Sequence, residues 1–167
     1  LVIAGEKQWG RAQLQSLPLM TTFSRQLHIS DDLLFEESDN ESGNKNTNAK
    51  KITCLSRKQT QQVLGTEYDC LVYDAYSSLD PDGVAAATGT VLGGGLVILL
   101  SPELEQWHNF LDPDYHRLLV HPFRDDQLEH LFIRRFADTI KNSAATAIVS
   151  QIHGASVCSL STQPGLV

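Results

Sequence analysis

The stretch "YDCLVYDAYSSLDPDGVAAATGTVLGGGLVILLSPE", Tyr68–Glu103, decides the fold class of this chain. It opens with an apolar run that ends in Asp74, continues with small residues that suit a helix, and closes with a second apolar run, Leu96–Leu100. Continuous apolar runs, rather than alternating ones, are typical of parallel strands that are buried on both faces. The stretch therefore predicts a strand–helix–strand unit whose first strand ends in an acidic residue.

Short apolar runs and helix-like segments alternate along the rest of the chain. This alternation predicts a single α/β domain over residues 1–167, a Rossmann-like three-layer sandwich with a mostly parallel sheet of about five to six strands. Strands are expected at 1–5, 19–25, 50–56, 69–76, 96–100 and 145–151. Helices are expected at 6–17, within 57–68 with Gly65 as the C-terminal stop, and at 80–95, 102–110 and 124–143.

Bulk composition narrows the class of protein. The 167 residues are 41% hydrophobic and 20% charged, as in an ordinary globular domain. The formal net charge of −7 disfavours strong binding of this chain to nucleic acid. No apolar stretch is long enough for a bilayer span, and no signal peptide is visible, which predicts no membrane partner and a cytoplasmic location. The strand-like opening "LVIAG" and the ending "STQPGLV" favour a fragment of a longer protein.

Two further features of the sequence, an acidic segment and the cysteines, indicate a structural rather than a functional role. Residues 31–50 are rich in acids and then in Asn, Gly, Ser and Thr, which predicts a mobile surface loop. An acidic lure for a basic partner is the alternative interpretation of this loop. The cysteines Cys54, Cys70 and Cys158 form no CxxC pair, which disfavours a zinc site and favours buried free thiols in a reducing cytoplasm.

The expected phosphate-binding signatures are missing at the ends of the strands. The first strand leads into Gly5 and Glu6, without the GxxxxGK[ST] of a P-loop or the GxGxxG of a dinucleotide fold, and Glu6 would repel a phosphate. The glycine triplet 93–95 precedes a strand instead of following one. We therefore expect the triplet to stop a helix and turn the chain into the next strand.

Asp74 occupies the strand end where a nucleotide-binding protein often carries a magnesium-organising acid. Without a P-loop it has no metal–phosphate group to organise, so we expect it to cap the next turn or to hydrogen-bond across the sheet end. The sequence also contains a cluster of histidines and aspartates, at His108, Asp112, Asp114, His116 and His121. Their spacing does not match a metal-binding motif such as HExxH, which disfavours a metal site. The sequence thus predicts no catalytic, cofactor-binding or metal residue, and leaves Gly5, Glu6 and Asp74 as a candidate strand-end crevice.

Several segments together resemble the N-terminal domain of the bacterial tRNA(Met) cytidine acetyltransferase family. The resemblance rests on "LVIAGEKQW" at 1–9 and on the block 63–107, which contains LG-x-E-[YF]-x₃-V-[YF]-D-A, the small-residue segment, the glycine triplet, Pro102 and Trp107. An amphipathic helix at Gln127–Lys141 falls where the family has one. The acidic segment 31–50 has no counterpart and looks like an insertion.

The resemblance implies a function for a longer parent protein. A member of this family forms N4-acetylcytidine at the wobble position of elongator tRNA(Met), using acetyl-CoA together with ATP or GTP hydrolysis and Mg. Its helicase-like ATPase and acetyltransferase modules, which follow the N-terminal domain in the same chain, hold the catalytic and nucleotide-binding residues. The resemblance therefore implies that this fragment is non-catalytic and packs on the ATPase module.

Two other functions stay open on the sequence alone. A stand-alone small-ligand or metal-dependent enzyme would use the strand-end crevice near Asp74. A tRNA-contacting module would instead present a local basic surface, although no run of lysine or arginine is visible.

Overall fold

The computed structural model describes residues 1–32, 50–110, 120–124, 127 and 130–156. Most of the predicted acidic loop, 33–49, lies outside these residues, so its predicted mobility stays a prediction. Four other residues discussed above also lie outside the described part of the chain: Asp112, Asp114, His116 and Cys158.

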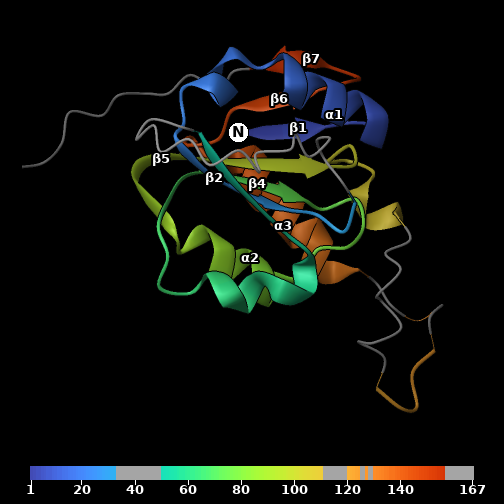
Figure 1. Ribbon diagram of the computed structural model, residues 1–167. Coiled ribbons are helices and arrows are strands. Elements are labelled where there is room, and N and C mark those ends of the chain that lie inside the picture. The colour runs from blue at the N-terminus through green and yellow to red at the C-terminus, as the bar shows by residue number, and fades with distance from the viewer. Residues whose placement is uncertain (33–49, 111–119, 125–126, 128–129, 157–167) are drawn as a thin grey trace, which may run out of the picture.

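Seven strands form one sheet in the order β3-β2-β4-β5-β1-β6-β7 (Figure 1). Strands β1 to β6 all run parallel to one another, and β7 is antiparallel to β6. The six parallel strands confirm the predicted α/β, Rossmann-like class. The bounds are β1 Val2–Ala4, β2 Arg25–Ile29, β3 Lys51–Leu55, β4 Tyr68–Asp74, β5 Val91–Ser101, β6 Ile148–Ser150 and β7 Gly154–Ser156.

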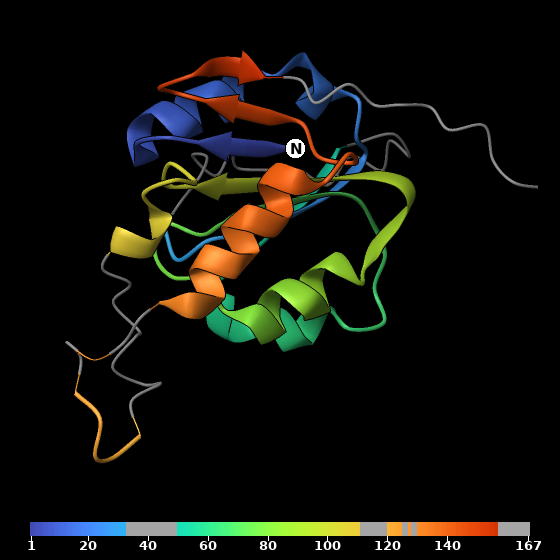
Figure 2. The same cartoon turned by 180° about the vertical axis from the view of Figure 1, so that it is seen from behind.

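Helices cover both faces of the sheet (Figures 1 and 2). Helix α1 (Lys7–Ser16) and the 3-10 helix η1 (Pro18–Thr21) lie on one face. The other face carries α2 (Pro81–Thr88), α3 (Leu131–Asn142) and two 3-10 helices, η2 (Arg57–Val63) and η3 (Trp107–Asn109). Of the helices in the described part of the chain, none is long and apolar enough to cross a membrane.

The two-sided cover explains the apolar runs that predicted the strands. Successive residues of a strand point to opposite faces, so a strand between two helical layers needs apolar residues at every position. In β4, Val72 joins the core cluster on the α1 face and Tyr73 joins the cluster on the α3 face. Both side chains are at most 1% exposed. The two hydrophobic cores therefore lie on opposite faces of the sheet, and the central strands contribute side chains to both.

The second strand was predicted too early in the chain. Residues 18–21 form the 3-10 helix η1, and β2 begins only at Arg25. The fully buried amide of Gln26 donates to the carbonyl oxygens of Met20, at 2.6 Å, and Phe23, at 3.1 Å. These carbonyls are thus satisfied by a side chain and not by a neighbouring strand, which keeps the segment out of the sheet.

The prediction that the glycine triplet 93–95 stops a helix is wrong. Helix α2 ends at Thr88, and residues 93–95 lie inside β5. The pairing of β4 with β5 shifts register here, from Tyr68 opposite Val91 to Cys70 opposite Leu96, so the glycines form an irregular, bulged part of the strand. Gly94 has a φ of +83°, a conformation that favours glycine, which explains why the bulge is built from this residue type.

The remaining predicted elements differ in length or type. The expected helices at 57–68 and 102–110 are the shorter 3-10 helices η2 and η3. The long amphipathic helix begins at Leu131 instead of at 124. Strand β7 was not expected, because its three small residues, Gly-Ala-Ser, carry no strand signal. Helix α2 agrees with its capping pattern, since Pro81 opens it and the Asp80 carboxylate accepts a hydrogen bond from the Asp82 N–H.

Candidate functional site at the strand ends

The strand order places the candidate crevice residues at the carboxyl edge of the parallel sheet, where the connections of two neighbouring strands diverge. Strand β1 leads into α1 on one face, whereas its neighbour β5 leads toward η3 and α3 on the other face. In open α/β sheets, ligands bind where neighbouring connections diverge in this way. Gly5 and Glu6 follow β1, and Asp74 ends β4 on the far side of β5. The structure therefore brings the three predicted crevice residues to the same sheet edge.

The Asp74 carboxylate is fully buried and is held by three groups of its own chain. Its Oδ2 accepts hydrogen bonds from Arg11 Nη2, at 2.9 Å, and from Ser30 Oγ, at 2.9 Å. Its Oδ1 accepts from the backbone N–H of Tyr76, at 2.9 Å. The carboxylate thus joins α1, the end of β2 and the turn after β4, which are the contacts of an acid that holds the end of the sheet together.

A second carboxylate continues this network toward the surface. Asp32 Oδ2 accepts from Arg11 Nη2, at 3.1 Å, and pairs with the Lys7 ammonium. Burial alone would lower the pKa of Arg11, but the hydrogen bonds and charges of Asp74 and Asp32 outweigh it and raise that pKa. The hydrogen bond from Lys7 lowers the pKa of Asp32. Two acids and two bases therefore balance each other, and the cluster has no excess positive charge to attract an anion.

Tyr76 closes the space between the turn after β4 and the start of α1. Its hydroxyl donates to the carbonyl oxygens of Gly5, at 3.0 Å, and Glu6, at 3.2 Å. Burial, and then the nearby charge of Asp74, raise the pKa of Tyr76, which favours the protonated hydroxyl that donates these hydrogen bonds. Gly10 provides the room for this ring, because a Cβ built there would lie 2.6 Å from the Tyr76 oxygen.

Gln151 lies at the N-terminus of α1, where a nucleotide-binding fold would place a phosphate. Its Oε1 accepts a 2.7 Å hydrogen bond from the backbone N–H of Glu6. A Cβ built at Gly5 would lie 2.7 Å from both the Cβ and the Oε1 of Gln151, and 2.7 Å from the Trp9 ring. The glycine therefore makes room for a side chain of the same protein, and the Glu6 amide is already used.

Glu103 holds the turn that carries Gln151. Its two carboxylate oxygens accept from Ser150 Oγ, each at 3.0 Å, and Oε1 also accepts from the Ile152 N–H, at 2.9 Å. Sequence reasoning missed the roles of both residues, since Glu103 and Gln151 are 48 positions apart and belong to no motif. Only the parallel pairing of β1 with both β5 and β6 brings these strand ends together.

The histidines and cysteines singled out in the sequence form no metal-ligand cluster in the described part of the chain. His108 lies in η3 and His121 in the segment 120–124, and the described residues contain no group of three or more potential metal ligands. Cys70 is buried as predicted, and burial raises the pKa of its thiol to about 11. Cys54 is exposed, contrary to the prediction, because β3 is an edge strand with only partial cover.

Fold and strand-end contacts together define a class of protein: a doubly wound α/β domain in which the side chains at the strand ends pair with one another. Over residues 1–151, the chain matches the family model described as tRNA(Met) cytidine acetyltransferase TmcA, N-terminal. The chain therefore belongs to the family of TmcA N-terminal domains, as its resemblance predicted.

Individual relatives agree with this membership. The chain is 35% identical over 97 residues to the tRNA(Met) cytidine acetyltransferase TmcA of Nitrosococcus halophilus, which covers 58% of this chain and 13% of the relative. It is 36% identical over 98 residues to the TmcA of Haloarcula marismortui, covering 59% and 13%. For the TmcA of Methanopyrus kandleri, the identity is 32% over 99 residues, covering 59% and 12%. The chain thus spans only a small part of the length of these relatives.

Proposed function

We propose that this chain is the non-catalytic N-terminal domain of a longer cytoplasmic enzyme that forms N4-acetylcytidine at the wobble position of elongator tRNA(Met). Family membership and the names of the relatives support this assignment. The small share of each relative that the chain covers supports the presence of further modules in such an enzyme. Acetyl-CoA, ATP or GTP and Mg would be bound by those modules.

The position of Gln151 carries the non-catalytic part of the proposal. Phosphate groups bind at helix N-termini through free backbone N–H groups, and here the Glu6 N–H donates to the Gln151 side chain instead. The contacts around Gly5 leave no space for a phosphate without moving Gln151. These residues do not fit a nucleotide or the phosphates of coenzyme A.

The alternative of a stand-alone enzyme that uses Asp74 has little support from the contacts. A metal or substrate at Asp74 would have to compete with existing hydrogen bonds, because Oδ2 accepts from Arg11 and Ser30 and Oδ1 accepts from the Tyr76 N–H. Breaking these bonds in a fully buried site is costly. We therefore assign Asp74 to the stability of the domain, and assign the domain an architectural role against the helicase-like ATPase and acetyltransferase modules.

The assignment is tested with the complete gene product. We expect it to restore N4-acetylcytidine to tRNA(Met) in a strain that lacks its own cytidine acetyltransferase, as measured by mass spectrometry of the purified tRNA. The 167-residue chain alone should restore none. Failure of the complete product would reject the enzyme assignment, and acetylation or ATP hydrolysis by the isolated chain would reject the architectural role.

A further inference from the structure

Exposed apolar side chains concentrate in one segment of the described chain, ahead of and at the start of α3. Eight large hydrophobic residues are exposed, and four of them lie between positions 120 and 132. Val120 is 71% exposed and Phe123 62%, while Leu131 and Phe132 are 59% and 49% exposed. Residues 120–124 lie away from the sheet and its helices (Figure 2), whereas Leu131 and Phe132 belong to the first turn of α3. Clusters of exposed apolar residues on a globular protein mark interaction sites.

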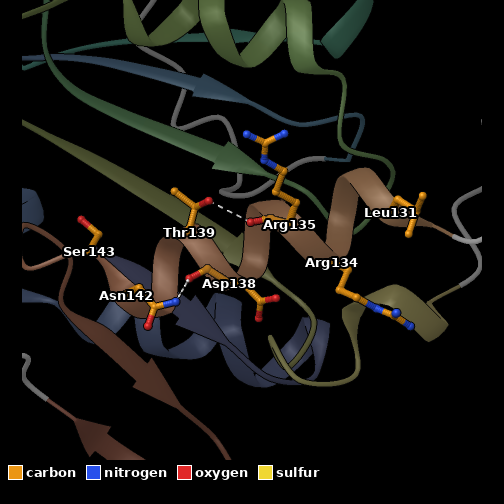
Figure 3. Close-up of a pocket in the computed structure, with 7 residues that line it drawn as sticks. All are labelled: Leu131, Arg134, Arg135, Asp138, Thr139, Asn142 and Ser143. Carbon is orange, nitrogen blue, oxygen red and sulfur yellow. Dashed lines mark hydrogen bonds between the residues drawn. The ribbon is translucent and has the colours of Figure 1, made fainter.

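Two arginines lie beside these apolar residues on the solvent side of α3. Arg134 and Arg135 are both exposed, and neither forms an ion pair with another described residue. Figure 3 shows their side chains leaving the helix in different directions, with Leu131 at its start. Helix α3 carries three basic residues and only one acid, Asp138, although the whole chain has a net charge of −7. The helix is therefore a locally basic surface.

The shape of this surface excludes a small ligand. A hollow runs along the helix and is lined by Leu131, Arg134, Arg135, Asp138, Thr139, Asn142 and Ser143 (Figure 3). All of these described lining residues belong to α3 and its C-terminal end, at alternating steps of three positions and one. Such a hollow cannot enclose a small molecule on several sides as a ligand pocket does. A macromolecular surface that lies along the helix fits it better.

We propose that the surface formed by Leu131, Phe132, Arg134 and Arg135 is a docking site for a protein surface that presents carboxylates around an apolar centre. The proposed partner is another module of the same polypeptide, so this inference rests on the proposed function. Arginine and aromatic residues are enriched where protein partners bind tightly, and the two arginines match carboxylates in charge. RNA fits less well, because Phe132 already stacks on Phe136, with ring centroids 5.9 Å apart, and only two diverging arginines could contact phosphates.

Site-specific photo-crosslinking in the complete enzyme tests the proposal. A benzophenone amino acid replaces Phe132, and a second variant carries it at Leu64, which is 62% exposed at the end of η2. We expect an intramolecular crosslink from position 132 to a segment outside residues 1–167 that contains acidic residues, and none from position 64. Arg134→Glu with Arg135→Glu should reduce the crosslink by about tenfold, because like charges then face each other.

The control for charge is Lys58→Glu, which reverses one charge at an exposed residue of η2 and should leave the crosslink unchanged. Circular dichroism of the isolated chain checks that each variant folds. A crosslink from position 132 to tRNA, to a second copy or only within residues 1–167 would overturn the proposal, as would no crosslink. Tests of acetylation are independent of this result, so a crosslinked but inactive enzyme would reject the proposed function and leave the docking site standing.

Discussion

Removing the Asp74 carboxylate should destabilise the domain strongly. Asp74→Ala leaves the Ser30 hydroxyl and the Tyr76 N–H without their acceptor and leaves Arg11 with Asp32 alone. Removing one partner of a fully buried ion pair costs about 3–5 kcal/mol. The Arg11 side chain is 23% exposed and keeps a second acid, so we expect a smaller loss, about 2–4 kcal/mol. For a domain of this size, that lowers the melting temperature by roughly 4–16 °C.

Urea unfolding followed by circular dichroism measures this loss, with Asp138→Ala as the matched control. Asp138 pairs with Lys141 on the surface of α3, where its side chain is 55% exposed, so its removal should cost at most about 1 kcal/mol. A double-mutant cycle with Arg11→Ala should give a coupling energy of at least about 1 kcal/mol between Arg11 and Asp74. If Asp74→Ala were as stable as the wild type, or the coupling were zero, the structural role assigned to Asp74 would be wrong.

Three further predictions concern single features of the fold. Gly10→Ala should destabilise the domain by about 1–3 kcal/mol, because its Cβ would lie 2.6 Å from the Tyr76 hydroxyl oxygen. This cost should largely vanish in a Tyr76→Phe background, which lacks that oxygen. Urea unfolding of the wild type, the two single variants and the double variant measures the difference. Burial lowers the pKa of His28 from 6.5 to about 4, so on acidification the unfolded chain binds a proton at a higher pH than the folded chain does. The free energy of unfolding should therefore be unaffected by His28 above about pH 6.5 and fall by up to about 3 kcal/mol as the pH approaches 4. A His28→Gln variant should show a shallower decline over this range, and an equally steep one would contradict the assignment. Gly94→Ala should cost about 1 kcal/mol because of its positive φ, whereas Gly93→Ala, with open space and no positive φ, should be neutral or stabilising; equal melting temperatures would argue against the bulge.

The sequence predicts the parallel part of the fold because burial on both faces leaves a continuous apolar signal. The runs that became β1, β4 and the second half of β5 are of this kind. The segment 19–25 was misassigned because its apolar residues suit either a strand or a turn, and the deciding contact is the buried Gln26 amide. The glycine triplet was misassigned because a bulge depends on the register between two strands, which is a property of the sheet.

The crevice was predictable in position but not in its contacts. Gly5, Glu6 and Asp74 follow strands in the sequence, so the fold class alone places them at one edge. Arg11 and Gln151 carry no motif, and their roles depend on which helix and which strand lie beside β1. Absent phosphate-binding motifs suggested a crevice without a ligand, while the side chains that line it could be found only from the packed structure.

The most direct test of the account is a titration of the isotopically labelled chain with Mg-ATP, Mg-GTP and acetyl-CoA, followed by amide NMR shifts. The backbone amides of Gly5, Glu6 and Tyr76 report on the crevice at the strand ends. We predict that these signals stay in place at millimolar ligand, because the Gln151 side chain and the Asp74 network already use the groups that a phosphate would need. Saturable shifts of these amides with micromolar affinity would show instead that the crevice is a binding site.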